Sequence, residues 1–215
     1  MLSEERRKRF RLDSTVGIVA VLSIVGSLAG SEPRRSGVIV GWGSQVVGAP
    51  SDLSHMVAVS AGGDHSLALK ADGSIAAWGR NSEGQTNVPA PNTGFVAVAA
   101  GDYHSLGLKA DGSIVAWGWN YYGQTNVPAP NNGFIAVAAG RFHSLGLKAD
   151  GSIVAWGYNT YGQTSIPAPN TDFVAIAAGG YHSLGLKADG SIVAWGRNDY
   201  GQTNVPAPNT GFVAV

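Results

Sequence analysis

Short apolar segments separated by turn residues run through most of this chain. One unit of the pattern, starting at Ser113, reads SIVAWGWNYYGQTNVPAPNNGFIAVAAGRFHSLGLKADG. Its apolar segments are rich in β-branched residues and shorter than the roughly ten residues that a helix needs, so they predict strands. We expect three strands in each sheet, for example at Phe134–Ala139, His143–Lys148 and Ile153–Trp156, the last of which begins the next copy of the unit.

Turn residues join these strands into an antiparallel sheet. An Asp150-Gly151 step lies between the last two strands, and it predicts a type I′ hairpin, in which both central residues have positive φ. The stretch NYYGQTNVPAP then returns to the next unit, and its two Pro residues exclude it from a central strand. A short outer strand near residues 125–127 is an alternative that the pattern allows, so each unit is predicted to have three or four strands.

The unit repeats every 39 residues, which is the step from His65 to His104. The residues that recur in four copies are His65, His104, His143, His182, Trp78, Trp117, Trp156 and Trp195. A fixed period of this length indicates a repeat architecture. Sheets that are apolar on both faces need neighbours to cover them, and radial stacking provides these neighbours. We therefore predict an all-β chain folded as a β-propeller, with a linear β-solenoid as the alternative.

The motifs AAG-x-x-HSLGLK-x-DG and WG-x-N-x-x-GQT resemble the repeat of the regulator of chromosome condensation family in its short bacterial form. The resemblance covers residues 37–215 and implies a propeller domain over that range. It extends to secreted, seven-bladed members of the family that inhibit a β-lactamase. Since residues 37–215 hold four full repeats and partial ends, we expect an incomplete seven-bladed ring from a longer protein. A five-bladed closure is the alternative.

An export signal is predicted at residues 1–29. Basic side chains between Arg6 and Arg11 precede an uncharged run from Ser14 to Ser31, and small residues near Ala29 offer a cleavage site. The apolar part is shorter than the roughly 20 residues that span a membrane, which is typical of a signal peptide. The alternative is an uncleaved signal anchor, which would be the membrane contact of this chain. Both alternatives make residues 30–36 a linker and place the propeller outside the cytoplasm, secreted or in the cell envelope.

Composition excludes several classes of function. The chain has 31 Gly, no Cys and only 13% charged residues, so it forms neither disulfides nor thiolate metal sites. Its formal net charge is +0, and beyond residue 29 nine basic and eleven acidic side chains leave a balance of −2. This balance does not favour a polyanion, so we expect no nucleic-acid partner.

Two loops of the repeat vary between copies, one between AG and HS and one after WG. Antiparallel strands turn at alternating ends, so both loops are predicted to share one face of the propeller. Aromatic and Arg side chains, which are enriched at binding hot spots, occur there. We call this surface the variable rim and predict that it binds a partner through Asp64, Arg80, Asp102, Tyr103, Trp119, Tyr121, Arg141, Phe142, Tyr158, Tyr181 and Arg197. The alternative is that these turns simply tolerate many residue types.

The family resemblance implies particular rim residues. In the secreted inhibitors, aromatic side chains at the turn before the His-Ser step contact the target enzyme, which points to Tyr103, Phe142 and Tyr181. Asp64 breaks this aromatic pattern in its own repeat. A further aromatic position is nearly constant and is predicted to belong to the scaffold; it holds Tyr122, Tyr161 and Tyr200, with Glu83 in the remaining copy.

The repeated His is predicted to be structural, bonding a loop and packing on Trp. One His per sheet, without clustered carboxylates, does not make a metal site, and one Asp per turn has too few oxygens for Ca²⁺. Each His precedes a Ser, but neighbours in a strand point to opposite faces and cannot form a nucleophile and base pair. We expect no enzyme, cofactor or metal.

The sequence therefore favours a non-catalytic propeller that binds a protein through the variable rim. A carbohydrate or cell-wall binding module is the first alternative, because Tyr and Trp faces can stack on sugars. Nucleotide exchange or chromatin binding, as in eukaryotic relatives of the repeat, is the second.

Overall fold

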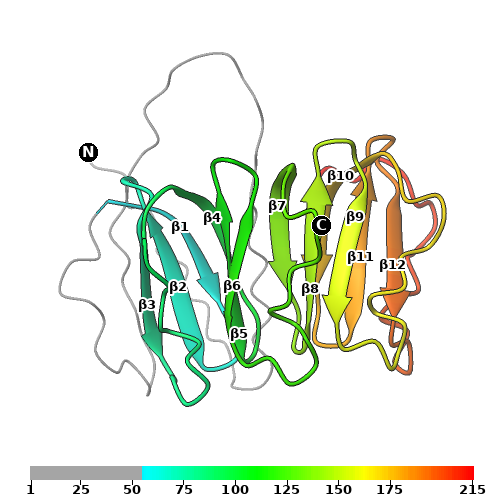
Figure 1. The fold of residues 1–215 in the computed structure, drawn as a ribbon. Coiled ribbons are helices and arrows are strands. Elements are labelled where there is room, and N and C mark those ends of the chain that lie inside the picture. Colours follow the sequence, from blue (N-terminus) through cyan, green and yellow to red (C-terminus); the bar gives the residue numbers. More distant parts are fainter. Residues whose placement is uncertain (1–54) are drawn as a thin grey trace, which may run out of the picture.

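The computed structural model describes residues 55–215, which form four three-stranded antiparallel sheets (Figure 1). The strands are β1 Met56–Ala61, β2 His65–Lys70, β3 Ile75–Gly79, β4 Phe95–Ala100, β5 His104–Lys109, β6 Ile114–Gly118, β7 Phe134–Ala139, β8 His143–Lys148, β9 Ile153–Gly157, β10 Phe173–Ala178, β11 His182–Lys187 and β12 Ile192–Gly196. We number the sheets blades 1 to 4 in chain order. The predicted signal at residues 1–29, the linker at 30–36 and the first part of the propeller at 37–54 lie outside the described residues.

The strand prediction is confirmed in each blade. In blade 3, β7 and β8 have the predicted bounds, and β9 ends one residue later, at Gly157. Residues 125–127 form a turn and an irregular segment, so the described blades have three strands. The returning loop is instead fastened to the edge of β6 by a side chain. Asn131 accepts a bond from the Ile114 nitrogen and donates one to the Ile114 carbonyl, both 2.8 Å long.

The expected type I′ hairpin is wrong. Gly151 has a φ of +80°, but Asp150 is not among the residues with positive φ. The Gly151 nitrogen donates to the Lys148 carbonyl at 3.0 Å, and the Lys148 nitrogen donates to Ser152 at 2.8 Å. This is a three-residue loop in which only the last residue is left-handed. Asp150 Oδ1 accepts bonds from the Ser152 nitrogen and hydroxyl, which holds the turn without requiring positive φ at the Asp.

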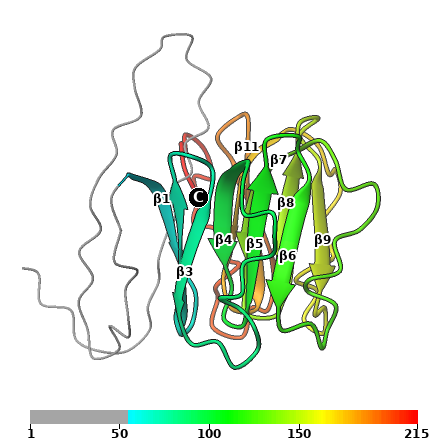
Figure 2. The ribbon, with the colours of Figure 1, turned by 60° about the vertical axis from the view of Figure 1, so that its left-hand side comes forward.

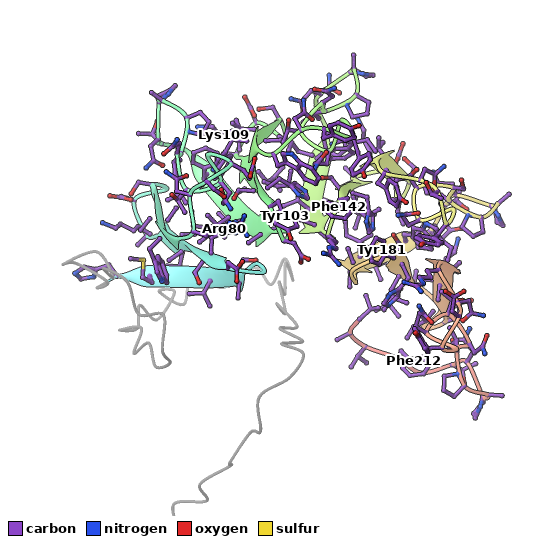
Figure 3. All side chains as sticks on the ribbon, turned by 90° about the horizontal axis from the view of Figure 1, so that it is seen from below. Arg80, Tyr103, Lys109, Phe142, Tyr181 and Phe212 are labelled. Atoms are coloured by element: carbon purple, nitrogen blue, oxygen red, sulfur yellow. The ribbon has the colours of Figure 1, made fainter. Side chains whose placement is uncertain are left out.

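The blades stack around the inner strands β1, β4, β7 and β10, which neighbour one another in that order. Figures 1 and 2 show the sheets packed face against face, and Figure 3 shows the blades following an arc. Each repeat forms its own sheet, so the solenoid alternative is wrong and the described residues form blades of a β-propeller. Residues 55–215 contain no helix long and apolar enough to cross a membrane.

The hydrophobic core lies between blades. One cluster joins Leu106, Leu108 and Ile114 of blade 2 to Phe134 and Trp156 of blade 3, all of them buried. Equivalent clusters join blades 1 and 2 and blades 3 and 4. Because each blade covers the next, the stack holds the turns of neighbouring blades at fixed positions along one face.

Buried hydrogen bonds also connect the blades. The Nε2 atom of His104 in blade 2 lies 2.9 Å from the Ser144 hydroxyl of blade 3. Ser144 in turn donates to the Gln124 carbonyl at 2.9 Å, and Trp156 Nε1 donates to the same oxygen at 2.9 Å. In blades 1 to 3 the repeated His therefore bonds a neighbouring blade, where we expected it to bond a loop. The repeated Trp and the buried Gln complete this connection.

Candidate functional site

The two variable loops of each blade meet on one face, as the alternation of turns predicts. The residue after WG donates its backbone N–H to the carbonyl of the residue before the His. This bond joins Trp119 to Tyr103 at 3.0 Å, and Tyr158 to Phe142 at 2.9 Å. The same bond joins Arg80 to Asp64 at 2.8 Å and Arg197 to Tyr181 at 2.9 Å. In each blade this backbone hydrogen bond therefore holds the two variable loops together.

Aromatic rings from three blades form a continuous row along this rim. The rings of Tyr103 and Phe142 are stacked, with centroids 5.6 Å apart and planes at 8°. Phe142 then meets Tyr181 edge-on at 6.0 Å. Figure 3 shows Tyr103, Phe142 and Tyr181 following one another along the inner side of the arc. The three residues that the family resemblance implies are thus brought together.

The loops after WG add a second row of rings. Trp119 lies 5.5 Å from Tyr103 and 5.1 Å from Phe142, and Tyr158 lies 6.1 Å from Phe142. Tyr121 is 77% exposed and stacks on Trp119 at 6.0 Å with planes 16° apart. All the predicted aromatic rim residues therefore belong to one surface.

Two rings that we predicted as scaffold also belong to the variable rim. Tyr122 lies 4.6 Å from Tyr158, and Tyr161 lies 5.5 Å from Tyr181. Their side chains are 38% and 41% exposed. The sequence did carry one signal of this, because Glu83 replaces the Tyr in blade 1. The position therefore accepts a side chain without a ring.

Ion pairs accompany the rings. Arg80 lies 3.3 Å from Asp64, Arg141 lies 3.4 Å from Asp102, and Arg197 lies 2.6 Å from Asp199. The guanidinium groups also stand over rim rings, with Arg80 over Tyr103 at 5.5 Å and Arg141 over Phe142 at 5.0 Å. Burial raises the pKa of the Asp102 carboxyl, and Arg141 opposes this rise. Of these residues, the sequence prediction omitted Asp199.

The buried histidines lie beneath this surface. Burial lowers the pKa of His104 to about 3 and that of His143 to about 4, so both are neutral near pH 7. Because Ser144 donates to a carbonyl, His104 must donate from Nε2, which leaves its buried Nδ1 without a hydrogen-bond partner.

The contact between His104 and Ser144 has the spacing of a base and a nucleophile. The two residues lie in different blades, whereas strand geometry excludes such a pair only between neighbours in one strand. Both side chains are 0% exposed, and the hydroxyl already donates to Gln124. We therefore assign the pair to blade attachment. Residues 55–215 contain no group of three His, Asp or Glu side chains placed to hold a metal ion.

A model of the regulator of chromosome condensation (RCC1) repeat matches residues 56–85, 95–124, 134–163 and 173–202. Each match starts with the inner strand of a blade and ends at the Gln of the returning loop. The chain belongs to the RCC1 repeat family. The expected likeness to β-lactamase-inhibiting members of the RCC1 family stays a prediction.

Solved structures with similar blades include RCC1-related propellers from several organisms. Prp20p from Saccharomyces cerevisiae has a TM-score of 0.60 and 22% identity over 70% of this chain and 46% of that chain. The CRINKLY WD40 ectodomain of the Arabidopsis thaliana receptor kinase ACR4 has a TM-score of 0.57 and 30% identity over 66% of this chain and 50% of that chain. Human WBSCR16 has a TM-score of 0.54 and 26% identity over 64% of this chain and 46% of that chain.

This RCC1-repeat chain therefore spans about half the length of the solved structures, 46% of Prp20p and 50% of the ACR4 ectodomain. A comparison with curated proteins gives no match.

Proposed function

We propose that this RCC1-repeat propeller is a non-catalytic binding protein that recognises a protein partner through the variable rim. The observation that carries the proposal is the continuous aromatic surface across blades 2, 3 and 4, with Tyr121 77% exposed and Tyr122 38% exposed. Exposed contiguous apolar patches mark interaction sites, and Tyr, Trp and Arg dominate their binding energy.

The ring geometry favours a protein over a carbohydrate. A sugar stacks on an open ring face, whereas most rim rings meet edge-on or tilted and cover one another, as Tyr122 and Tyr158 do at 54°. Such a surface presents a corrugated mixture of edges and hydroxyls, which suits the side chains of a protein. One observation favours a glycan, namely the exposed Tyr121 ring stacked nearly parallel to Trp119. Carbohydrate binding is therefore the second candidate.

The fold relatives support macromolecular binding. The structure of Prp20p is described together with its binding to Gsp1p and histones, and Prp20 is also seen bound to Kap60. Chromatin binding through DNA is less favoured for the present chain, because the net balance of −2 beyond residue 29 does not favour a polyanion. The export signal predicted at residues 1–29 argues against nucleotide exchange.

We propose further that the protein is exported, because residues 1–29 have the composition of a signal segment. N-terminal sequencing of the protein recovered from the cell envelope or medium tests this, and we expect cleavage near Ala29 or an intact anchor. Recovery of the intact chain from the cytoplasm alone would contradict export.

Capture experiments with a rim variant test the binding proposal. The full chain and its Tyr103→Ala/Phe142→Ala/Tyr181→Ala variant are immobilised and exposed to envelope and secreted proteins. We expect the wild type to retain a partner that the variant loses. The matched control is Val96→Ala/Ile135→Ala/Val174→Ala, which removes three side chains that are 43%, 43% and 53% exposed near the opposite end of the blades. Equal capture by the wild type and the rim variant would contradict the proposal.

A further inference from the structure

Charges are ordered along the inner turns of the variable rim. Asp64 and Asp102 occupy the turns of blades 1 and 2, and Arg141 occupies that of blade 3. The turns lie against one another, since a Cβ on Gly63 would be 3.3 Å from the Cα of Asp102. Asp64 pairs with Arg80 inside blade 1, so the opposite charges that face each other between blades are Asp102 of blade 2 and Arg141 of blade 3, beside the ring of Phe142.

The pair formed by Asp102 and Arg141 differs from the other two ion pairs among residues 55–215. Arg80 bonds Ser82 at 2.8 Å and Asp64 at 3.3 Å, and Arg197 bonds Asp199 at 2.6 Å, all within one blade. Asp102 and Arg141 join two blades at 3.4 Å. That contact lacks hydrogen-bond geometry, and the buried Arg141 Nε has no hydrogen-bond partner. The contact of Asp102 with Arg141 is therefore the longest of these three ion pairs, and it lacks the hydrogen bond that the other two have.

Packing nevertheless holds the pair of Asp102 and Arg141 in place. The Arg141 guanidinium stands 5.0 Å from the Phe142 ring and 5.6 Å from the Tyr181 ring. Its backbone N–H donates to the Gly180 carbonyl of blade 4 at 3.2 Å. Burial raises the pKa of Asp102, because the carboxylate has lost hydrating water and the nearby Arg141 compensates for that loss only in part. Arg141 and Asp102 are still 39% and 40% exposed, so both can be reached by a partner.

We propose that the partner is a protein segment carrying an ordered charge pair, with an Asp or Glu that binds Arg141 and a neighbouring Lys or Arg that binds Asp102. This inference rests on the proposed protein-binding function and adds the chemistry of the partner. The surrounding rings exclude water and strengthen both contacts, and the planar fork of Arg suits a carboxylate. Such complementary charges set the orientation and specificity of a complex.

Selection of peptides on the full chain tests this inference. A displayed library of random linear peptides is selected on the wild type and on Asp102→Arg/Arg141→Asp. The double variant keeps the net charge and an ion pair between the blades, but it reverses the order of the charges. We expect wild-type peptides to carry an acidic residue beside a basic one and to bind the reversed protein at least roughly tenfold more weakly. Peptides selected on the reversed protein should show the opposite order.

A second variant separates the two proposals, namely the triple Ala replacement of Tyr103, Phe142 and Tyr181. Peptides that need these three rings but bind both charge orders within about twofold would overturn the charged-pair inference and leave rim binding intact. Peptides that tolerate the loss of the rings would overturn rim binding itself, as would a wild type that enriches no peptide. Equal thermal unfolding of wild type and double variant shows that a lost affinity is not lost folding.

Discussion

The ring of Phe95 lies directly over Gly107 on the neighbouring strand, where a Cβ would approach Phe95 Cε1 to 2.5 Å. The same contact recurs in blades 3 and 4. Blade 1 instead combines Met56 with Ala68, and both are buried. Where the middle strand has Ala instead of Gly, the inner strand has the more flexible Met instead of Phe. The side chains at these two positions are therefore matched in volume.

This relationship predicts how Gly107→Ala will behave. The new methyl group would press on Phe95 and would also lie 3.3 Å from Ile75 Cδ1 of blade 1. We expect the free energy of unfolding to fall by about 1–3 kcal/mol, as for other overpacked cores. Urea unfolding followed by circular dichroism measures the change.

The chain supplies the compensating variant, because blade 1 carries the combination of Met and Ala. We expect Phe95→Met added to Gly107→Ala to recover part of the lost stability. A double variant whose loss equals the sum of the two single losses would show that the two positions are not matched.

A second prediction concerns acid stability. Burial lowers the pKa of His104 to about 3 and that of His143 to about 4, from an ordinary value of 6.5. Between about pH 6.5 and 4 the unfolded chain therefore binds more protons than the folded chain. The free energy of unfolding should fall as the pH falls through this window, by up to several kcal/mol, since each pKa unit is worth about 1.4 kcal/mol. Urea unfolding at several pH values measures the slope.

The control for the acid effect is His143→Gln, which keeps a side-chain N–H donor and removes the titration. Its slope should be shallower than that of the wild type, and an unchanged slope would exclude His143 as a cause. The Asp carboxyls of the hairpin turns affect the free energy of unfolding in a lower pH range. A hydrogen bond from Ser113 lowers the pKa of Asp111, so its stabilising contribution is lost only below its ordinary value of 3.8.

A third prediction tests the bonds between blades. Ser144→Ala removes the partner of His104 Nε2 and one donor to the Gln124 carbonyl. Because both groups would stay buried, we expect a loss of about 1–3 kcal/mol in the free energy of unfolding. Ser152→Ala is the matched control, since its hydroxyl bonds only the exposed Asp150 and should cost much less. Equal losses would mean that the buried bond adds nothing specific.

The strands were predictable because period and turn residues define them within one repeat, as Phe134–Ala139 shows. The hairpin type was not, because an Asp-Gly step fits loops of two or three residues and the register of Lys148 with Ser152 decides between them. The contact between His104 and Ser144 depends on how two sheets pack, which no single repeat encodes. The shared face of the two loops followed from strand alternation, which is a property of a single sheet. The ring contacts of Tyr122 depend on how neighbouring blades pack, so the repeat alone did not predict them.

The last prediction concerns Tyr122, which the repeat pattern assigned to the scaffold. Its ring lies 5.4 Å from Phe142 and 4.6 Å from Tyr158, so it bridges two blades within the rim. We expect Tyr122→Ala to weaken binding of a captured partner by roughly tenfold or more, because a central ring is lost and its neighbours are loosened. Tyr200→Ala is the matched control. Its ring is 85% exposed and lies 5.7 Å from Arg197, at the edge of the surface, and its loss should change affinity little. Calorimetry with the captured partner compares the two variants, and an equal effect of both would place the binding centre elsewhere on the rim.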